Sequence, residues 1–357
     1  MIYQIKPVIG NLAKKNIVKY IKGNNWLTEY QRTTDFEKKF ANFTNSKHCI
    51  AFPNGTLTMY AILECLNLPS NSEVLVSNYT MIATANVVKM SGLKLQLVDI
   101  SEKDLCMCPI DLIKKITKKT KVVIYTPMNG RIGQINEIKR ICKSRGIYLV
   151  EDAAHAIGCY NKKKHVGSAG IAASFSFSMP KLITMGQGGA IITNNSQLAK
   201  KLRLFKNFGR YFDGVDIHNY IGYNFKITDL QSILATSQLL DIKKRMKIKK
   251  SIFQRYYRNL INNKKVKLFK IEKNETPWSF DIYIKNRNKI KKILKQKNIL
   301  TRNVYPPINS QKIYKSFKSK NLKVSNNYCK NGLWLPSSLD LKLSQVDQIC
   351  KILNQIL

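Results

Sequence analysis

Short apolar runs alternate with segments of helical spacing through the first half of the chain, and this alternation limits the possible folds more than any other feature. The strand-like runs cover residues 73–77, 93–99, 121–126, 147–152, 172–177 and 189–193. Helical segments at residues 82–90, 109–116 and 136–144 separate several of them. This pattern predicts an α/β protein with a mostly parallel sheet covered by helices on both faces. Ligands of such sheets bind beyond the carboxyl ends of the strands.

The chain on either side of this region has other patterns. Before it, we expect helices near residues 11–22 and 34–43, a strand at 49–52 and a mostly buried helix at 57–66. The strand at 49–52 adds a seventh strand to the expected sheet.

After about Thr228 the chain is helical and then mixed. Residues 229–257 predict one or two long helices with a dense lysine face. The segments of a small α+β domain follow at residues 265–270, 278–284, 288–297, 301–305 and 344–357. We therefore expect a large domain over residues 1–228, which includes the N-terminal arm, and a small domain over residues 229–357 with a long linking helix.

The composition is that of a globular but very basic chain. Of its 357 residues 44% are hydrophobic, which argues against a disordered basic tail. The net charge of +40 comes from 61 Lys and Arg against 21 Asp and Glu. One interpretation is an anionic partner, either a nucleic acid or a phosphate-bearing substrate. We favour solvated helical faces instead, because the lysines occur in short pairs without the interleaved aromatic residues of a nucleic-acid platform.

Cysteine and histidine are scattered along the chain. The eight cysteines and four histidines show no spacing typical of a zinc site, so we expect no metal and free thiols in a reducing compartment. The first residues lack the apolar core of a signal peptide, and no apolar run approaches the ~20 residues of a membrane helix. These features predict a soluble cytoplasmic protein without membrane contact.

Residues 150–194 carry the groups that pyridoxal phosphate (PLP) requires. The cofactor's aldehyde needs an amine, its pyridine nitrogen needs a carboxylate, and its phosphate needs hydroxyl and backbone N–H groups. Lys181, Asp152 and Ser176 supply these groups in turn. Lys181 also precedes a glycine cluster at 186–189, which lets the backbone pass close to a bulky ligand. Burial there would lower the pKa of the lysine and favour a nucleophilic amine.

Each of these residues also has a purely structural interpretation. Asp152 could cap a helical turn, and Ser176 could make a structural hydrogen bond within a strand. His155 could be a core histidine, or it could bond the ring oxygen of the cofactor or stack on its ring. The pairing of Asp152 with Lys181 favours the cofactor in each case.

A phosphate site is expected between the strand at 49–52 and the helix at 57–66. Asn54, Gly55 and Thr56 form a turn that leads into a helix N-terminus, where free backbone N–H groups and the helix dipole attract anions. Taken alone, this tripeptide is more typical of an ordinary turn.

At these residues the sequence resembles the DegT/DnrJ/EryC1/StrS family of sugar aminotransferases, which are PLP enzymes of the aspartate aminotransferase fold (fold type I). The resemblance spans nearly the whole chain. Its motifs are Asn54-Gly55-Thr56, residues 80–87 (TMIATANV), Glu151-Asp152-Ala153-Ala154-His155, Ser176-Phe177 with Lys181 and the glycines at 186–189, Gly222-Tyr223-Asn224-Phe225-Lys226, and Tyr305-Pro306-Pro307. The aspartate box, the Ser-x4-Lys segment and the glycine cluster are highly specific in combination.

The resemblance implies a role for each matching residue. Lys181 would bond the cofactor and shuttle the proton, Asp152 would pair with the pyridine nitrogen, and His155 would stand beside the ring. The residues that would bind the phosphate are Gly55, Thr56 and Ser176. Asn224 would reach the cofactor phosphate of the neighbouring subunit, which implies a homodimer with shared active sites.

The resemblance also implies a reaction. An amino group would pass from glutamate to C4 of a nucleotide-linked 4-keto-6-deoxyhexose, giving a viosamine- or perosamine-type sugar for glycan synthesis. Two half-reactions would share one site, so we expect ping-pong kinetics.

Two other kinds of function stay open at this point. Within the family, the alternatives are 3-amination and a PLP-dependent dehydratase; such dehydratases carry His in place of the lysine, so Lys181 argues against them. A non-catalytic nucleic-acid-binding protein on the same fold is suggested only by the net charge of +40.

Three positions depart from the family's pattern. Met81 stands where an aromatic residue usually covers the pyridine ring; a thioether can pack there more weakly, and Tyr79 is a candidate to compensate. Lys226 replaces the usual Arg and loses its bidentate fork. Asn309 stands where a His is common, which puts the usual substrate contacts there in doubt. None of these changes removes a group essential to transamination.

Overall fold

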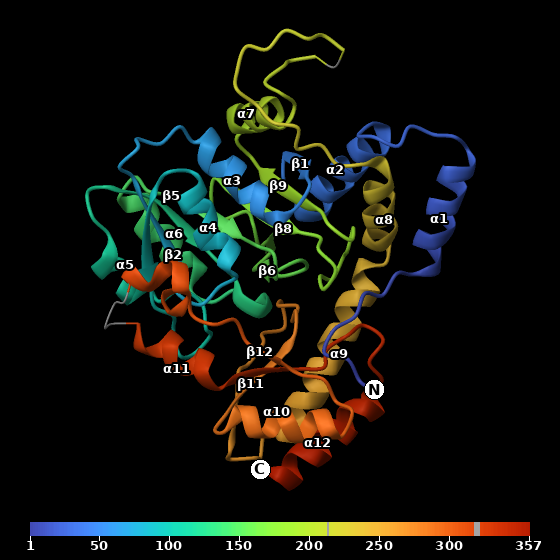
Figure 1. The fold of residues 1–357 in the computed structure, drawn as a ribbon, viewed down its shortest axis with the longest axis vertical. Coiled ribbons are helices and arrows are strands. Elements are labelled where there is room, and N and C mark those ends of the chain that lie inside the picture. Colours follow the sequence, from blue (N-terminus) through green and yellow to red (C-terminus); the bar gives the residue numbers. More distant parts are fainter. Residues whose placement is uncertain (213, 318–321) are drawn as a thin grey trace.

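A seven-stranded sheet forms the centre of the larger part of the molecule (Figure 1). The structure is a computed structural model that describes residues 1–212, 214–317 and 322–357. The strands are β1 (His48–Phe52), β2 (Glu73–Ser77), β3 (Lys94–Val98), β4 (Thr120–Tyr125), β5 (Tyr148–Asp152), β8 (Ala172–Ser176) and β9 (Gly189–Thr193). Their order is β1-β9-β8-β5-β4-β2-β3, and β9 runs antiparallel to both neighbours while the other adjacent pairs are parallel. The expected sheet of seven mostly parallel strands is confirmed.

Two hydrophobic cores lie on the two faces of this sheet, because successive side chains of a strand point in opposite directions. Leu75 and Val123 belong to one core, whereas their neighbours Val76 and Ile124 belong to the other. The helices that contribute to the first core are α2 (Gln31–Thr44), α5 (Pro109–Lys115), α6 (Ile135–Ser144) and α8 (Asp229–Leu240). Those that contribute to the second are α3 (Gly55–Cys65), α4 (Ile82–Met90) and α7 (Ser196–Lys206).

A second sheet of four strands lies in the C-terminal part of the chain. Its order is β10 (Val266–Leu268), β11 (Phe280–Ile284), β13 (Gly332–Leu335) and β12 (Arg302–Asn303), with antiparallel pairing throughout. The helices around it are α9 (Ile242–Leu260), α10 (Arg287–Gln296), α11 (Lys323–Asn331) and α12 (Leu343–Ile356). This sheet has a third core of its own, which includes Phe280, Leu333 and Leu353. Helices α8 and α9 follow one another and lead from the large sheet to the small one (Figure 1).

The N-terminal segment contacts both parts of the molecule. The backbone N–H of Ile2 donates to the carbonyl of Asn298, and the N–H of Ser337 donates to the carbonyl of Gln4. Helix α1 (Asn11–Lys22) then packs along α8 (Figure 1). The expected boundary after residue 228 stays a prediction: the large sheet precedes it and the small sheet follows it, while the first residues lie on the small sheet.

A buried carboxylate from a distant helix holds the start of α2. Helix α2 has no capping side chain at Tyr30 itself, so its first N–H groups need other acceptors. Asp229, at the start of α8, accepts hydrogen bonds from the backbone N–H groups of Tyr30 (2.9 Å), Arg32 (3.0 Å) and Thr33 (3.0 Å). The hydroxyls of Thr33 (2.8 Å) and Tyr20 (3.2 Å) donate to it as well. Asp229 therefore fastens the N-terminal arm to α8.

Several elements of the structure were not expected from the sequence, among them α7, α11 and β13. Strand β13 is only four residues long and fully buried, so it shows no alternation that would reveal it. The long helical segment at 229–257 is two helices, α8 and α9, which meet at Asp241. Two short strands, β6 (Tyr160–Asn161) and β7 (Lys164–His165), form a hairpin after β5. None of the helices in the described ranges combines the length and apolar character that a membrane span requires.

Candidate active site

The carboxyl ends of three strands meet at one edge of the large sheet. Phe52, the last residue of β1, pairs with Gly189 of β9, which in turn pairs with Ser176 at the end of β8. Strand β5 lies parallel to β8 on its other side and ends at Asp152. The sheet register therefore brings the turn at 54–56, Ser176 and Asp152 to the same edge, where ligands of α/β sheets bind.

Lys181 lies in the turn that follows β8. Its backbone N–H donates to the carbonyl of Ser178 (3.0 Å), and its Nζ lies 4.9 Å from the ring centroid of Trp278. The pKa of Lys181 is lowered to about 7: burial lowers it most, the carboxylate of Asp152 raises it, and the charge of Arg302 lowers it. A large fraction of this amine is therefore neutral near pH 7 and able to act as a nucleophile.

Asp152 is a buried carboxylate at the last position of β5. The hydroxyl of Thr84 donates to its Oδ2 (2.7 Å), and the N–H of Ala154 donates to its Oδ1 (3.3 Å). Burial raises the pKa of Asp152, while the bond from Thr84 and the charge of Lys181 oppose that rise. The N–H of Ala154 lies two residues on, so Asp152 also makes the local turn contact that its structural interpretation expected.

His155 stacks on Trp278, with ring centroids 4.0 Å apart and an angle of 9° between the planes. Its Nδ1 is buried and has no hydrogen-bond partner among the described residues. Burial lowers the pKa of His155 well below its ordinary value, so the imidazole is neutral. Trp278 covers one face of the His155 ring, and Nδ1 at the edge of that ring has no partner in the described chain. This geometry favours a hydrogen bond from His155 to a ligand over stacking on the ligand.

The N-terminus of α3 packs closely against the end of β8. The Asn54 side chain caps this helix by accepting from the N–H of Leu57 (2.9 Å). A Cβ added at Gly55 would lie 3.0 Å from the Cβ of Ser176, so only glycine leaves this cradle open. Thr56 lies in the first turn of α3, whose leading N–H groups have no partner within the helix. Gly55, Thr56 and Ser176 are thus brought together as expected.

Met81 precedes α4 and is 43% exposed, at the helix that also carries Thr84. Tyr79 cannot compensate for the missing aromatic residue. Its ring is fully buried and packs edge-on against Tyr328, with centroids 5.0 Å apart, so the expectation that Tyr79 compensates is wrong.

Asn309 is hydrogen-bonded to Asn78. Its backbone N–H donates to Asn78 Oδ1 (3.0 Å), and its Oδ1 accepts from Asn78 Nδ2 (3.2 Å). Asn78 therefore holds the backbone and the side-chain oxygen of Asn309, the residue that stands where a His is common.

Asn224 lies in a different cavity from Lys181. It is exposed and lines a hollow of about 1230 Å³ at the base of the connection between α7 and α8, together with Lys206 and Lys226. Lys181, Asp152 and Ser176 do not line this cavity. Within a single chain, Asn224 is therefore not brought to the other expected site residues.

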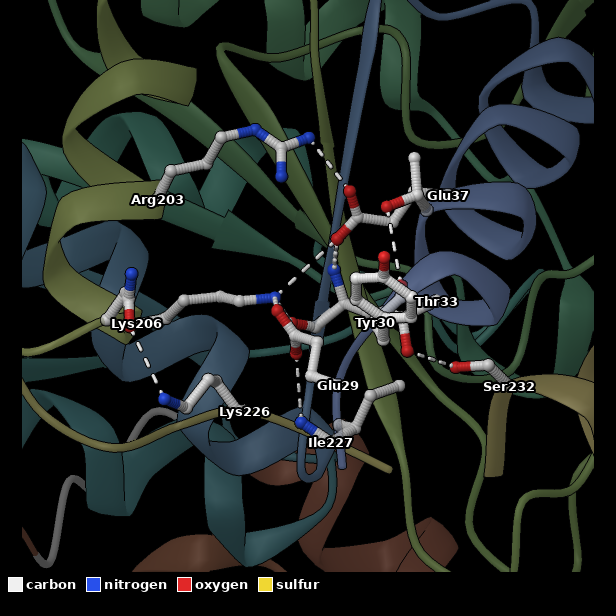
Figure 2. Close-up of polar contacts among 12 residues, drawn as sticks. Glu29, Tyr30, Thr33, Glu37, Arg203, Lys206, Lys226, Ile227 and Ser232 are labelled. Carbon is white, nitrogen blue, oxygen red and sulfur yellow. Dashed lines mark hydrogen bonds and ion pairs between the residues drawn. The ribbon is translucent and has the colours of Figure 1, made fainter. Parts of the chain in front are cut away.

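A buried ion pair fixes the wall of this cavity (Figure 2). Glu29 contacts the Nζ of Lys206 (2.7 Å) and accepts from the backbone N–H of Ile227 (3.0 Å). The same Nζ donates to the carbonyl of Ala51 (2.9 Å). These bonds hold the chain a few residues from Asn224, so the position of Asn224 depends on the N-terminal arm.

Sequence reasoning missed the aromatic side of the site. A continuous set of ring contacts, which we call the aromatic wall, joins His155, Trp278, Tyr305 and Trp334. The ring centroids of Trp278 and Trp334 are 5.1 Å apart, and those of Tyr305 and Trp334 are 4.7 Å apart. No local signal marks Trp278, because it comes from the segment before β11 and reaches the site only through tertiary packing. In the described ranges, no group of His, Cys, Asp and Glu side chains is arranged to hold a metal ion.

Proteins of known structure share this architecture. A DegT/DnrJ/EryC1/StrS aminotransferase from Brucella abortus has 25% identity and a TM-score of 0.91, with 97% of this chain and 95% of that chain covered. The Helicobacter pylori aminotransferase PseC, involved in the biosynthesis of pseudoaminic acid, has 24% identity and a TM-score of 0.94 over 98% of this chain and 97% of that chain. Fold and site together define the class: a PLP-dependent aminotransferase of fold type I.

Within that class, the chain belongs to the DegT/DnrJ/EryC1/StrS aminotransferase family, because the sequence profile of that family matches residues 9–354. It is 30% identical to the GDP-perosamine synthase of Escherichia coli O157:H7 over 325 residues, which cover 90% of this chain and 88% of that protein. It is 29% identical to the GDP-perosamine synthase of Vibrio cholerae over 361 residues, with 98% of both chains covered.

Proposed function

We propose that the edge formed by Asp152, Ser176 and Lys181 binds PLP, and that the protein uses it to move an amino group from glutamate to a nucleotide-linked 4-keto-6-deoxyhexose. The observation that carries this proposal is that Lys181, whose pKa is lowered to about 7, lies in the turn after β8 and within range of the charge of Asp152, the buried carboxylate at the end of the neighbouring strand. A lysine near neutrality beside a buried acid has little structural value, but it suits a nucleophilic amine and a proton carrier.

The residues of this edge fit the proposed cofactor. When bound, PLP withdraws electrons from the substrate carbon, so that a proton can leave it. Lys181 would bond the cofactor's carbon and then carry that proton from one substrate atom to another. Asp152 would keep the pyridine nitrogen protonated through its charge, and Thr84 would hold the carboxylate in place through its 2.7 Å hydrogen bond.

The other end of the cofactor would lie at the start of α3. Gly55, Thr56 and Ser176 would receive the phosphate through backbone N–H groups and hydroxyls, where the helix dipole favours a negative charge. His155, neutral and with a free buried Nδ1, would bond the edge of the pyridine ring. Met81 would contact the face of that ring through its thioether.

The sugar substrate follows from the relatives. Curated proteins named GDP-perosamine synthase are 28–30% identical to this chain over at least 90% of its length. Their name favours amination at C4 of the sugar over amination at C3. Lys181 argues against the PLP-dependent dehydratases, which carry His at that position.

A second copy of the chain would complete the site. The connection between α7 and α8 projects from the body (Figure 1) and exposes large apolar side chains, among them Phe212 (71%), Ile217 (67%) and Ile221 (89%). Such a surface favours burial against a partner. We infer a homodimer in which Asn224 and Lys226 of one subunit reach the cofactor phosphate of the other.

The oligomeric state tests this arrangement directly. Ile221→Asp should shift the protein from dimer to monomer in analytical ultracentrifugation and lower the activity with it. Ile110→Asp is the matched control, because Ile110 is 67% exposed on α5 and lies outside this surface. A dimer that persists in Ile221→Asp would argue against this contact.

The reaction is tested in two stages. Purified protein mixed with PLP should show the absorbance of lysine-bound cofactor and lose that absorbance when glutamate is added. The Lys181→Ala variant should show neither change. The UDP-, dTDP- and GDP-linked 4-keto-6-deoxyhexoses should then restore the absorbance, and NMR of the product should place nitrogen on C4. Nitrogen on C3, or a product without nitrogen, would replace the proposal with one of its alternatives; no PLP binding at all would refute it.

A further inference from the structure

Arg302 packs against two rings of the aromatic wall. It is the first residue of β12 and pairs with Trp334 of β13 in the sheet register. The Cζ of its guanidinium lies 5.6 Å from the ring centroid of Tyr305 and 5.6 Å from that of Trp334. Two rings thus orient the cation, so that little conformational freedom is left for it to lose when a ligand binds.

No carboxylate in the part of the chain that the structure describes forms an ion pair with Arg302. Other arginines in this molecule are paired: both terminal nitrogens of Arg131 bond Asp281, and Arg255 makes two bonds of 2.6 Å to Asp347. Arg302 is exposed, and no residue of the described chain accepts a hydrogen bond from its guanidinium group. An oriented guanidinium without a counter-ion is the group that proteins use to bind carboxylates and phosphates in a bidentate manner.

The aromatic wall connects this cation to the reactive lysine. Lys181 contacts Trp278, Trp278 contacts Trp334, and Trp334 contacts Arg302. Arg302 is close enough for its charge to lower the pKa of both Lys181 and His155. The aromatic wall therefore links Lys181 to the exposed Arg302 through two tryptophan rings.

We propose that Arg302 is the residue that binds the anionic group of the substrate, either the carboxylate of the amino donor or the diphosphate of the sugar nucleotide. It can have this role only if the protein takes glutamate and a nucleotide-linked sugar, as proposed above. Both substrates must present a reacting carbon to Lys181 in turn, and each carries an anion at a distance from that carbon. Arg302 would fix this distance and so select among ligands.

The experiment measures binding and does not depend on turnover. The PLP-loaded protein is titrated in a calorimeter with glutarate, which has the carboxylates of glutamate without its amine, and separately with UDP, dTDP and GDP. Arg302→Met keeps an unbranched apolar stem against Tyr305 and Trp334 and removes the charge. Arg140→Met, on the exposed face of α6 with a side chain 76% accessible, is the control for the same loss of charge elsewhere.

Arg302→Met should lower the affinity for at least one of these ligands by about 10-fold or more, because a charge-assisted hydrogen bond is lost. If only the affinity for glutarate falls, Arg302 binds the carboxylate of the amino donor. If only the affinity for a nucleotide falls, Arg302 binds the diphosphate. If both affinities fall, the two substrates share Arg302 as a binding residue. Arg302→Lys should fall between the two proteins, since it keeps the charge and loses the fork. Arg140→Met should bind as the wild type does.

Unchanged affinity for every ligand, in a folded Arg302→Met protein, would overturn this role. If that variant fails to fold, Arg302→Lys decides: an affinity equal to the wild type overturns it as well. A wild-type protein that binds neither glutarate nor any nucleotide would instead contradict the proposed function, so the two failures are distinguishable.

Discussion

The indole of Trp278 stacks on the imidazole of His155 at 4.0 Å and donates its Nε1–H to the carbonyl of Pro180 at 2.9 Å. Pro180 directly precedes Lys181, so one side chain from the segment before β11 holds two residues at the edge of the large sheet. The orientation of the reactive lysine therefore depends on how the C-terminal part of the chain packs against that edge.

Replacing Trp278 separates its two contacts. Trp278→Phe keeps a ring against His155 and loses the hydrogen bond to Pro180, which should cost about 1 kcal/mol of the free energy of unfolding. Trp278→Ala also leaves a cavity and should cost about 3–5 kcal/mol. Urea denaturation followed by circular dichroism measures both.

The same two variants should slow the half-reaction with glutamate, because a lysine that is displaced by a fraction of an ångström loses its alignment. We expect Trp278→Phe to lower kcat/KM by about 10-fold. Trp26→Phe is the matched control, since Trp26 is 65% exposed and its ring packs against Tyr30. Equal activity of Trp278→Phe and wild type would mean that the bond to Pro180 does not position Lys181.

The uptake of PLP by the cofactor-free protein should depend on pH through Lys181. The amine reacts only when it is neutral, so the rate should rise with pH around the lysine's pKa of about 7. Asp152 raises this pKa by its charge, and removing that charge in Asp152→Asn should move the midpoint of the rise to lower pH. Stopped-flow absorbance at a series of pH values measures the midpoint. A midpoint near the ordinary lysine pKa of 10.5 would contradict the burial of this amine, and a midpoint that moves up in Asp152→Asn would contradict the effect of the Asp152 charge.

Lys249 should make the stability of the fold depend on pH. This lysine of α9 is buried, donates to the carbonyl of Ser337, and has its pKa lowered by burial to about 7. Between that value and its ordinary pKa of 10.5 the folded protein holds fewer protons than the unfolded chain, so the free energy of unfolding should rise with pH across this window.

Lys249→Met should flatten that rise, because the titrating group is gone. The slope removed should approach about 1.4 kcal/mol per pH unit in the middle of the window. Lys247→Met serves as the control, since Lys247 is on the same helix and exposed. Parallel stability curves for Lys249→Met and wild type between pH 7 and pH 10 would show that Lys249 stays protonated when folded.

Asp229 should be required for the start of α2. It accepts hydrogen bonds from three backbone N–H groups and two hydroxyls, and an amide in its place offers one oxygen instead of two. Asp229→Asn should lower the free energy of unfolding by about 1–3 kcal/mol. Amide hydrogen exchange at Tyr30, Arg32 and Thr33 should become faster in this variant. Asp35→Asn is the control: this half-buried residue of α2 contacts the side chain of Arg32, at 3.5 Å, and bonds none of these backbone N–H groups, so both measurements should stay unchanged.

Much of the large sheet could be predicted from the sequence. Its strands are short, apolar and buried on both faces, so each one appears as a local run; all seven expected strands exist, and their ends differ by no more than about two residues. The small sheet was harder, because β12 and β13 are two and four residues long and too short to show a period.

The sequence by itself determined the groups that lie close together along the chain. Asp152 and Ser176 end adjacent parallel strands of one sheet, and Lys181 lies in the turn that follows the second of them, so the parallel register brings these groups to one edge. Tertiary structure decided the partners that lie far away in the sequence. Trp278 stacks on His155, and Arg302 packs against Trp334. Asp229 bonds the start of α2, and Tyr79 packs against Tyr328 in the core and away from the site. These contacts depend on how separately formed layers pack against each other, and no local spacing carries that information.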